Sequence, residues 1–355
     1  MDDKYINRCF ELAKKGIGKV SPNPLVGCVV VKEDNIIGEG WHEEFGKSHA
    51  EINAFKNCIT SPEGSTLYCN LEPCSHTNKK TPPCVPEIIK QKISKVIISN
   101  IDPNPDVNGK GIEQLRKSGI EVINGIEEER GKELNRIFFK YVKAKKPYVT
   151  VKVAQTADGK ITEVNGKQSW ITGNEAGEFV HRQRGIFDAV LVGANSVIVD
   201  DPMLTVRHIE GRNPIRIILD GKLSMPESAR VIKNDEPEKT WIVTGNDSNA
   251  DKKNLLKQKG VKIIEFQVNG KKNIDVNELL KQLGSNNISS VLVEGGRQVF
   301  SQFIEQELFD ELVVLQSPKI FGKGLDSVSL SKTINLKMKS AEKLGKDLKI
   351  IYERV

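Results

Sequence analysis

Apolar and polar positions recur along the first part of the chain with two periodicities, one typical of strands and one typical of helices. Short runs rich in Val and Ile predict strands, whereas apolar residues three or four positions apart predict helices. Strands are expected over residues 25–32, 35–42, 65–72, 95–100 and 120–125. Helices are expected over residues 4–15, 50–58, from Pro86 onward, 111–119 and 127–143. This alternation predicts a layered α/β sheet covered by helices on both faces.

A second series of elements follows the segment KAKKP, residues 143–147, which is the expected linker because proline disfavours helix in the residue before it. Further strands are expected over residues 148–156, 188–193, 215–220, 240–245, 262–266, 290–296, 310–317 and 347–355. Helical patterns lie near residues 174–184, 251–259, 275–284 and 296–306. Because 355 residues exceed what one hydrophobic core usually serves, we predict two α/β domains, residues 1–146 and 147–355.

Composition and charge narrow the class of protein. Hydrophobic residues make up 38% of the chain and charged residues 28%, as in soluble globular proteins. No apolar run approaches the ~20 residues of a membrane span, so we expect a cytoplasmic protein with no membrane partner. The net charge of +6 is spread over mixed-sign surface, which suits small anionic ligands and argues against a nucleic-acid partner.

The cysteines are confined to the first domain, because all six lie within the first 84 residues. In a cytoplasmic enzyme such thiols are expected to be buried apolar residues or metal ligands rather than disulfides. Four lie in apolar patterns and are expected to fill the core: Cys9, Cys28, Cys58 and Cys69. Cys74 and Cys84 instead flank a polar, proline-rich loop, which indicates metal ligands.

The stretches HAEINAF and LEPCSHTNKKTPPC contain the donors of a zinc site. Zinc favours tetrahedral sets of nitrogen and sulfur, and a catalytic zinc has three protein ligands and one open position. His49, Cys74 and Cys84 form such a set, and we predict one zinc ion per chain. Glu51 is left over to carry protons and is the predicted catalytic residue. Because residues two apart point about 200° apart on a regular helix, His49 and Glu51 are expected at a loop-to-helix junction.

Deamination is the chemistry that this set of residues favours. Zinc nucleobase deaminases carry H-x-E and P-C-x-x-C, and this chain has HAE and Pro73-Cys74, with nine residues between Cys74 and Cys84. Zinc makes hydroxide available for attack on an amino-bearing ring carbon, while Glu51 carries the proton. Three residues are predicted to contact the substrate, each with a turn or surface role as the alternative: Asn23, His42 and His76. The alternative for the metal is a structural zinc, with His76 as fourth ligand.

Motifs along the whole chain resemble one known family. They are SPNPLVGCVVV, GEGWH, HAE, LEPCSH, TPPC and DPNP, followed by VKVAQTADGKI, QSWIT, LVGANSVIVDDPMLTVR, PIRIILD, VEGG and SPKIFGKG. In this order they resemble the bifunctional deaminase-reductase of riboflavin biosynthesis. The resemblance implies a cytidine-deaminase-like three-layer α/β/α domain followed by a dihydrofolate-reductase-like α/β domain.

The same resemblance implies two successive reactions on a phosphorylated pyrimidine. The first domain would use zinc, bound by His49, Cys74 and Cys84, to hydrolyse the 2-amino group of 2,5-diamino-6-(5-phosphoribosylamino)pyrimidin-4-one. Glu51 would be the proton carrier. The second domain would use NADPH to reduce the ribosyl group to ribityl phosphate. The resemblance also allows a homo-oligomer.

The second half has physical features that suit hydride transfer, which needs positioning and phosphate anchors. In VLVEGGRQVF the Gly295-Gly296 turn precedes a helix, so that backbone N–H groups can approach a pyrophosphate, with a plain turn as the alternative. Arg207, together with Arg184 and Lys152, is expected to form a cationic pocket for the ribose 5-phosphate. The alternative for the loop that carries Arg207 is a solvated surface loop.

By resemblance, two sets of residues line the reductase site. Those expected to contact the substrate are Lys152, Gln168, Arg184, Leu204, Arg207 and Glu294. Those expected to contact the cofactor are Ala154, Trp170, Ser196, Asp200, Gly295 and Gly296. The chain departs from the family pattern in two places, since the loop between Cys74 and Cys84 is one residue longer and Gln168 replaces a serine that commonly binds substrate. His181 and His208 are expected to be surface or helix residues without a role.

Other functions fit the sequence less well. An RNA or DNA base editor would have the short P-C-x-x-C spacing and a basic tail, and it would leave the second half unexplained. A zinc-stabilised scaffold would not need the carboxylate of HAE. The intact ligand set and VEGG argue against a decayed half, although Gln168 leaves that alternative open for the reductase.

Overall fold

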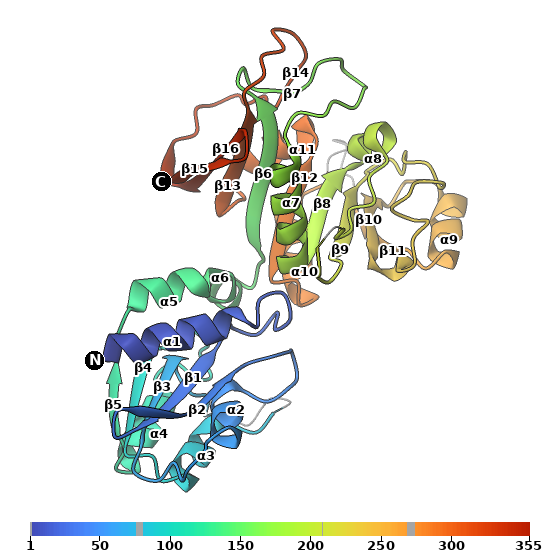
Figure 1. Ribbon diagram of the computed structural model, residues 1–355. Helices are drawn as coiled ribbons and strands as arrows, with labels where there is room; N and C mark the ends of the chain where they lie inside the picture. Colours follow the sequence, from blue (N-terminus) through green and yellow to red (C-terminus); the bar gives the residue numbers. More distant parts are fainter. Residues whose placement is uncertain (1, 76–80, 208, 268–273) are drawn as a thin grey trace. The chain divides into compact units, whose positions relative to one another are not determined.

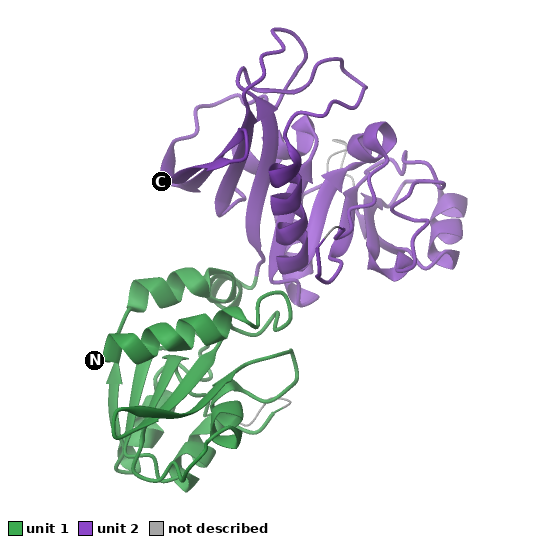
Figure 2. Cartoon of the chain, viewed as in Figure 1, with its two compact units in different colours: residues 1–145 green, residues 146–355 purple. Residues whose placement is uncertain are grey.

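The computed structural model describes residues 2–75, 81–207, 209–267 and 274–355. The chain forms two compact units, residues 1–145 and 146–355, which Figure 2 shows in green and purple. None of the helices in these described ranges is long and apolar enough to span a lipid bilayer.

The first unit is built on a five-stranded sheet with the order β2-β1-β3-β4-β5 (Figure 1). Its strands are β1 (Gly27–Lys32), β2 (Asn35–Trp41), β3 (Thr66–Leu71), β4 (Lys95–Asn100) and β5 (Glu121–Asn124). β2 and β3 run antiparallel to β1, whereas β3, β4 and β5 are parallel to one another. The helices are α1 (Asp2–Lys14), α2 (Ala50–Lys56), α3 (Cys84–Lys90), α4 (Lys110–Lys117), α5 (Glu128–Leu134) and α6 (Arg136–Ala144).

Alternation along the strands gives this sheet two apolar faces. Val29 and Val31 of β1 pack with α1 on one face. Cys28 and Val30 pack with α2, α3 and α4 on the other face. The predicted α/β/α layering of this unit is therefore confirmed. Of the cysteines expected to fill the core, three are fully buried and Cys58 is half-buried.

Two helix boundaries in this unit differ from the prediction. The single helix expected over residues 127–143 is interrupted at Asn135, whose φ of −103° and ψ of 21° separate α5 from α6. The side chain of Asn135 is buried and bonded to Leu25, a contact that periodicity does not reveal. In addition, α3 begins at Cys84 rather than Pro86, because Pro83 takes the extended N-cap position and proline is tolerated in a first helical turn.

The second unit contains a nine-stranded sheet with the order β11-β10-β9-β8-β12-β6-β13-β16-β15. Its strands are β6 (Tyr148–Thr156), β8 (Ala189–Gly193), β9 (Ile215–Leu219), β10 (Thr240–Gly245), β11 (Lys262–Phe266), β12 (Ser290–Gly295), β13 (Glu311–Ser317), β15 (Leu336–Leu344) and β16 (Asp347–Arg354). The strands from β11 to β13 are parallel, and β16 and β15 continue the sheet antiparallel. β7 (Lys160–Thr162) and β14 (Leu325–Asp326) form a separate pair.

Helices cover both faces of this sheet as well. They are α7 (Asn174–Ile186), α8 (Ala194–Asp200), α9 (Ala250–Gln258), α10 (Val276–Ser285) and α11 (Arg297–Glu305), with a short 3-10 helix η1 (Pro237–Lys239). α10 and α11 pack against Val151 and Val153 of β6, whereas α7 packs on the opposite face, against Val313 and Leu315 of β13. Among the described elements of this unit, five were not predicted: η1, β7, β14, α8 and β15. α8 is short and lies within an apolar run, and β15 is mostly exposed, so it shows no apolar alternation.

Candidate functional site

Three donor side chains converge in the first unit. His49 occupies the N-cap position of α2, Cys74 follows β3, and Cys84 is the first residue of α3. The Nδ1 atom of His49 lies 3.4 Å from the Sγ atom of Cys74 and 3.3 Å from that of Cys84. All three ligand atoms lie within 4.8 Å of one another. The structure thus brings together the residues that the sequence indicated as ligands.

The spacing and chemistry of this set fit a zinc ion. With Zn–N and Zn–S bonds of ~2.0 and ~2.3 Å, neighbouring ligands of a tetrahedral site lie about 3.5 Å apart, close to the two separations from His49. The backbone N–H groups of Cys84 and Val85 donate to the Cys74 carbonyl oxygen at 3.0 and 3.2 Å. These bonds hold Cys74 at the start of α3, where free N–H groups and the helix dipole favour a thiolate.

The second ring nitrogen of His49 also has a partner. Its Nε2 atom lies 3.0 Å from the Oγ1 atom of Thr81. A neutral histidine that binds a metal through Nδ1 carries its proton on Nε2, so Nε2 donates to the hydroxyl oxygen and the ring orientation is fixed. Thr81 was not predicted, because a threonine in a loop carries no pattern of its own. Its place inside TPPC is the one signal that the sequence offers.

Glu51 lies in the first turn of α2, and its side chain is buried. Its carboxyl group is within hydrogen-bonding reach of the Cys84 thiol, so it faces the donor set. Burial, reinforced by the neighbouring Cys74 thiol, raises the pKa of Glu51. His49 precedes the helix with an extended ψ of 165°, which allows it and Glu51 to face the same site. The expected loop-to-helix junction is confirmed.

Asn23 and His42 contact each other beside this site. The Nδ1 atom of His42 lies 3.1 Å from the backbone carbonyl oxygen of Ser48, which can only accept, so Nδ1 carries the proton. The Nε2 atom therefore accepts from the Asn23 amide nitrogen at 3.0 Å. Burial lowers the pKa of His42, which keeps the ring neutral, and its centroid lies 5.5 Å from that of His49. His76, the third predicted substrate contact, lies outside the described residues.

A buried carboxylate anchors the end of β3. Glu72 directly precedes Pro73-Cys74 and is only 3% exposed. Its two carboxylate oxygens accept hydrogen bonds from four backbone N–H groups, at 2.9 to 3.3 Å, which belong to Asp102, Gly109, Gly111 and Ile112. Glu72 thus ties the segment between β3 and Cys74 to Asp102 and to the start of α4, a role that was not predicted from the sequence.

Replacing Glu72 by glutamine is expected to loosen the zinc site. Each carboxylate oxygen accepts two of the four bonds, so an amide nitrogen in either place leaves two buried N–H groups without an acceptor, at roughly 1–3 kcal/mol each. Loss of partners behind metal ligands weakens metal binding about 10- to 100-fold, and we expect that range here. Zinc transfer to a chromogenic chelator measures it. The exposed Glu113→Gln variant on α4 is the control, and equal transfer from both variants would contradict the role of Glu72.

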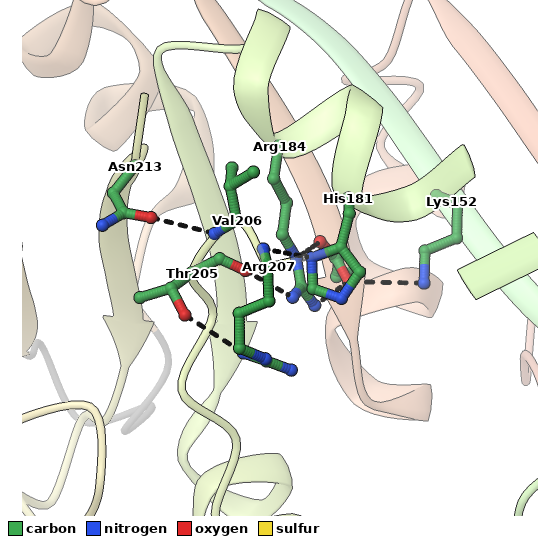
Figure 3. Close-up of polar contacts among 8 residues, drawn as sticks. Lys152, His181, Arg184, Thr205, Val206, Arg207 and Asn213 are labelled. Atoms are coloured by element: carbon green, nitrogen blue, oxygen red, sulfur yellow. Dashed lines mark hydrogen bonds and ion pairs between the residues drawn. The ribbon is translucent and has the colours of Figure 1, made fainter. Parts of the chain in front are cut away.

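In the second unit the buried carboxylate of Glu294 forms ion pairs with two cationic side chains. The Nε and Nη2 atoms of Arg184, on α7, donate to the two oxygens of Glu294 at 2.6 and 2.8 Å. The Nζ atom of Lys152, on β6, lies 3.4 Å from Glu294, which belongs to β12. Figure 3 shows the side chains of Lys152 and Arg184. Burial alone would raise the pKa of Glu294, but the charges of Arg184 and Lys152 lower it to about 2. The carboxylate is therefore ionised at neutral pH.

This pairing changes the cationic pocket expected from the sequence. Lys152 and Arg184 are both paired with Glu294 rather than free. The Nη1 atom of Arg207 donates to the hydroxyl of Thr205 at 3.0 Å, and no ion pair to a described carboxylate involves it. Burial and the charge of Arg184 lower the pKa of Arg207. With three cations and one carboxylate, the cluster stays net positive.

The segment of residues 204–207 is tied to α7 at two points (Figure 3). Arg184 donates to the Thr205 carbonyl oxygen at 3.2 Å, and the backbone N–H of Arg207 donates to the Nδ1 atom of His181 at 3.1 Å. Leu204 is buried with a φ of 55°, which is uncommon for a residue other than glycine, so its surroundings hold it there. His181 is a helix residue, as expected, but the expectation that it has no role is corrected, because its ring holds this segment. Its three-residue spacing from Arg184, on one helix face, was the available signal. His208 lies outside the described residues.

Two of the residues expected to contact a cofactor, Gly295 and Gly296, lie at the turn between β12 and α11. Gly296 has a φ of 87°, a conformation that favours glycine, so the tight turn indicated by VEGG is present. A Cβ atom on Gly295 or Gly296 would lie 3.1 Å from the Oγ atom of Ser196. Ser196 and Asp200 both belong to α8, so this helix and the glycine turn form one region.

Three other predicted residues of the reductase site belong to β6 and to the loop after β7 rather than to that turn. Ala154 packs beside α7 two residues after Lys152, on the same face of β6. Gln168 and Trp170 lie on an exposed loop after β7, and 81% of Trp170 is exposed. In the described part of the chain, no hydrogen bond or ion pair joins these two side chains to the cluster around Glu294.

Comparisons with known proteins cover both units. Residues 1–100 match the family model of the cytidine and deoxycytidylate deaminase zinc-binding region. Residues 147–350 match the model of the RibD C-terminal domain. The riboflavin biosynthesis protein RibD of Aquifex aeolicus is 42% identical over 360 residues, which cover 100% of this chain and 99% of that protein.

Solved structures agree with these matches. RibD of Acinetobacter baumannii superposes with a TM-score of 0.90 at 33% identity, and 100% of this chain and 99% of that chain are covered. The diaminohydroxyphosphoribosylaminopyrimidine deaminase/5-amino-6-(5-phosphoribosylamino)uracil reductase of Thermotoga maritima gives a TM-score of 0.86 at 38% identity, with the same coverage. The predicted fold class and family resemblance are confirmed. The chain belongs to the bifunctional deaminase-reductase family of riboflavin biosynthesis.

Proposed function

We propose that residues 1–146 hydrolyse the 2-amino group of 2,5-diamino-6-(5-phosphoribosylamino)pyrimidin-4-one. Residues 147–355 then reduce the ribosyl side chain of the product to ribityl phosphate with NADPH. The observation that carries the proposal is the convergence of His49, Cys74 and Cys84 beside the buried carboxylate of Glu51. The name of the Thermotoga maritima protein, a deaminase and reductase of such pyrimidines, supports the substrate class.

In the deaminase reaction, His49, Cys74 and Cys84 hold one zinc ion, which supplies Lewis-acid activation of water when bound. Glu51 carries the two protons of the attacking water in turn, one to the ring nitrogen and one to the amino group that leaves as ammonia. His42 holds the amide nitrogen of Asn23, which leaves the Asn23 amide oxygen to accept from a substrate N–H or hydroxyl group. His76 is a further proposed substrate contact.

In the reductase reaction, Arg207 is the proposed anchor of the 5-phosphate, because its guanidinium carries no described carboxylate partner. Glu294 holds Arg184 and Lys152 in place at the same site. The full proposed substrate set is Lys152, Gln168, Arg184, Leu204, Arg207 and Glu294. NADPH would be bound by Ala154, Trp170, Ser196, Asp200, Gly295 and Gly296, where the glycine turn admits a close approach of a pyrophosphate to backbone N–H groups.

A single assay tests the order of the two reactions. The zinc-loaded protein is given the diaminopyrimidine substrate anaerobically, and ammonia release and NADPH oxidation are followed together. We expect ammonia without NADPH, and then NADPH oxidation equal in amount to the ammonia released. NADPH oxidation in the absence of ammonia release would contradict the proposed order, and no ammonia at all would contradict the proposed deaminase substrate.

A further inference from the structure

Two buried asparagines hold the loop that leads into β1. The amide of Asn135 bonds to both backbone groups of Leu25, accepting from its N–H at 2.8 Å and donating to its carbonyl oxygen at 3.0 Å. The amide of Asn70 donates to the same carbonyl oxygen at 2.9 Å and accepts from the N–H of Gly27 at 2.7 Å. Asn70 is fully buried and Asn135 is 3% exposed. All four amide atoms are thus used on one short segment.

These side chains make hydrogen bonds to the loop that the backbone of a neighbouring strand would otherwise make. The backbone pairing between β1 and β3 ends at Cys28 and Cys69, and one position further along the side chain of Asn70 binds Gly27 instead. Asn135 binds Leu25 as a residue of an adjacent strand would, through one donor and one acceptor. It does so from the break between α5 and α6, 110 residues further along the chain. The break in the helix places this amide against the loop.

The held segment carries Asn23, which we have proposed as a substrate contact. Only Pro24 separates Asn23 from Leu25, and a proline fixes its own φ and restricts the residue before it. The backbone N–H of His42 donates to the carbonyl oxygen of Val26 at 2.8 Å, so the same segment also places His42. His42 in turn bonds to the Asn23 amide. Fixing residues 25–27 therefore fixes both side chains.

We propose that Asn135 and Asn70 are positioning residues of the deaminase reaction, because their amides fix the loop that presents Asn23 and His42 to the substrate. This inference rests on the proposed role of Asn23. Both asparagines act on backbone groups of Leu25 and Gly27, and neither is among the proposed substrate contacts or metal ligands. A displacement of about 1 Å in a positioning group can lower a rate on the order of 100-fold, so their effect on turnover is large although they act through other residues.

Asn135→Asp in the full zinc-loaded protein tests the proposal. A carboxylate has the shape of the amide but turns an oxygen toward the Leu25 carbonyl oxygen, so the donated bond is lost and the loop shifts. We expect kcat/KM for ammonia release to fall about tenfold or more, while zinc content and the reduction of separately supplied deaminated substrate stay unchanged. Asn124→Asp, at an exposed position of β5, is the matched control and should behave as the wild type.

A double-mutant cycle with Asn23→Ala separates positioning from a general loss of stability. If Asn135 acts through Asn23, adding Asn135→Asp to Asn23→Ala lowers kcat/KM by a clearly smaller factor than Asn135→Asp does alone, because coupled residues are not additive. The part of the effect that remains acts through His42, which the same segment places. Independent, multiplying effects would overturn the inference. If Asn135→Asp loses zinc or unfolds, the cycle is run with Asn70→Asp, which loses its hydrogen bond to the same carbonyl oxygen of Leu25. Multiplying effects of Asn70→Asp and Asn23→Ala would also overturn the inference.

The same data distinguish the failure of this inference from failure of the proposed function. A wild-type protein that releases no ammonia contradicts the proposed deaminase substrate. Full activity of Asn23→Ala contradicts the substrate role of Asn23 and therefore also the positioning role of Asn135 and Asn70. Reduced activity of Asn23→Ala with independent loss from Asn135→Asp contradicts the positioning role alone.

Discussion

Replacing Glu51 by glutamine is expected to slow ammonia release by a factor of about 10² to 10⁴, the range for loss of a positioned general acid-base. The amide has the shape of the carboxylate but cannot take a proton from water or return it to the leaving group. Zinc content should stay at one ion per chain, because the three described donors are His49, Cys74 and Cys84. The measurement is the initial rate of ammonia release, with zinc determined on the same sample.

The second domain of the same chain supplies an internal control for this variant. The rate of NADPH oxidation with separately supplied deaminated substrate should equal that of the wild type, which shows that the second unit is folded and that the protein is correctly quantified. Glu113→Gln, which removes an exposed carboxylate on α4, should leave ammonia release unchanged. Loss of zinc from the Glu51→Gln variant would mean that Glu51 is a ligand. More than about a tenth of the wild-type rate would exclude it as the proton carrier.

The donor residues of the zinc site could be predicted because they are chemically distinctive and lie in short motifs. A histidine, two thiols and a spare carboxylate narrow the metal to zinc whatever the fold around them. The strands that position them were also predictable, since β1, β3 and β4 are apolar runs of the right length. The helical period also predicted that His49 and Glu51 lie at a loop-to-helix junction, and the extended N-cap residue is the geometry that lets both face one site.

The residues that hold this site in place could not be predicted in the same way. Glu72, Thr81 and Asn135 act through bonds to backbone groups or to one ring nitrogen, and their partners lie 30 or more residues away. Such contacts depend on which loops the fold brings together, and a backbone N–H group carries no residue-type signal. The break at Asn135 illustrates this, because its flanking helices keep the apolar spacing of one continuous helix.

Charge pairing in the second unit could not be predicted from the sequence for the same reason. The sequence singles out Lys152, Arg184 and Arg207 as cations and Glu294 as a polar residue in an apolar strand. That Glu294 pairs with two of them follows from the strand order, since β12 lies beside β6, and from the passage of α7 over that face. An expectation of free cations therefore became a buried ion-pair network.

Replacing Glu294 by glutamine is expected to destabilise the second unit by about 3–5 kcal/mol and to abolish NADPH oxidation. The side chains of Lys152 and Arg184 are only 10% and 11% exposed, so the neutral amide leaves two like charges buried without a counter-charge. Hydrogen exchange of β6 and β12, followed by mass spectrometry, measures the loss of stability where the pair lies. Ammonia release should stay at the wild-type rate, because the deaminase residues belong to the first unit.

The pH dependence of this loss separates a charge effect from a change of packing. The pKa of Glu294 falls from 4.5 to about 2 in the folded chain, so its ionisation stabilises the fold above pH 4.5. That contribution, about 3 kcal/mol from the shift, declines as the pH falls below 4.5 and is lost below about 2. The difference between wild type and Glu294→Gln should therefore be constant from about pH 8 to pH 5 and shrink only in acid.

Glu278→Gln is the matched control, because Glu278 pairs with Lys281 at 3.0 Å and both side chains are more than half exposed. Water screens such a pair, so we expect the control to lose less than about 1 kcal/mol. If Glu294→Gln loses no more than this control, Arg184 and Lys152 do not depend on the carboxylate. If it is stable yet inactive, Glu294 serves the reaction directly, whereas lost stability together with lost reduction places it as the counter-charge that holds both cations at the site.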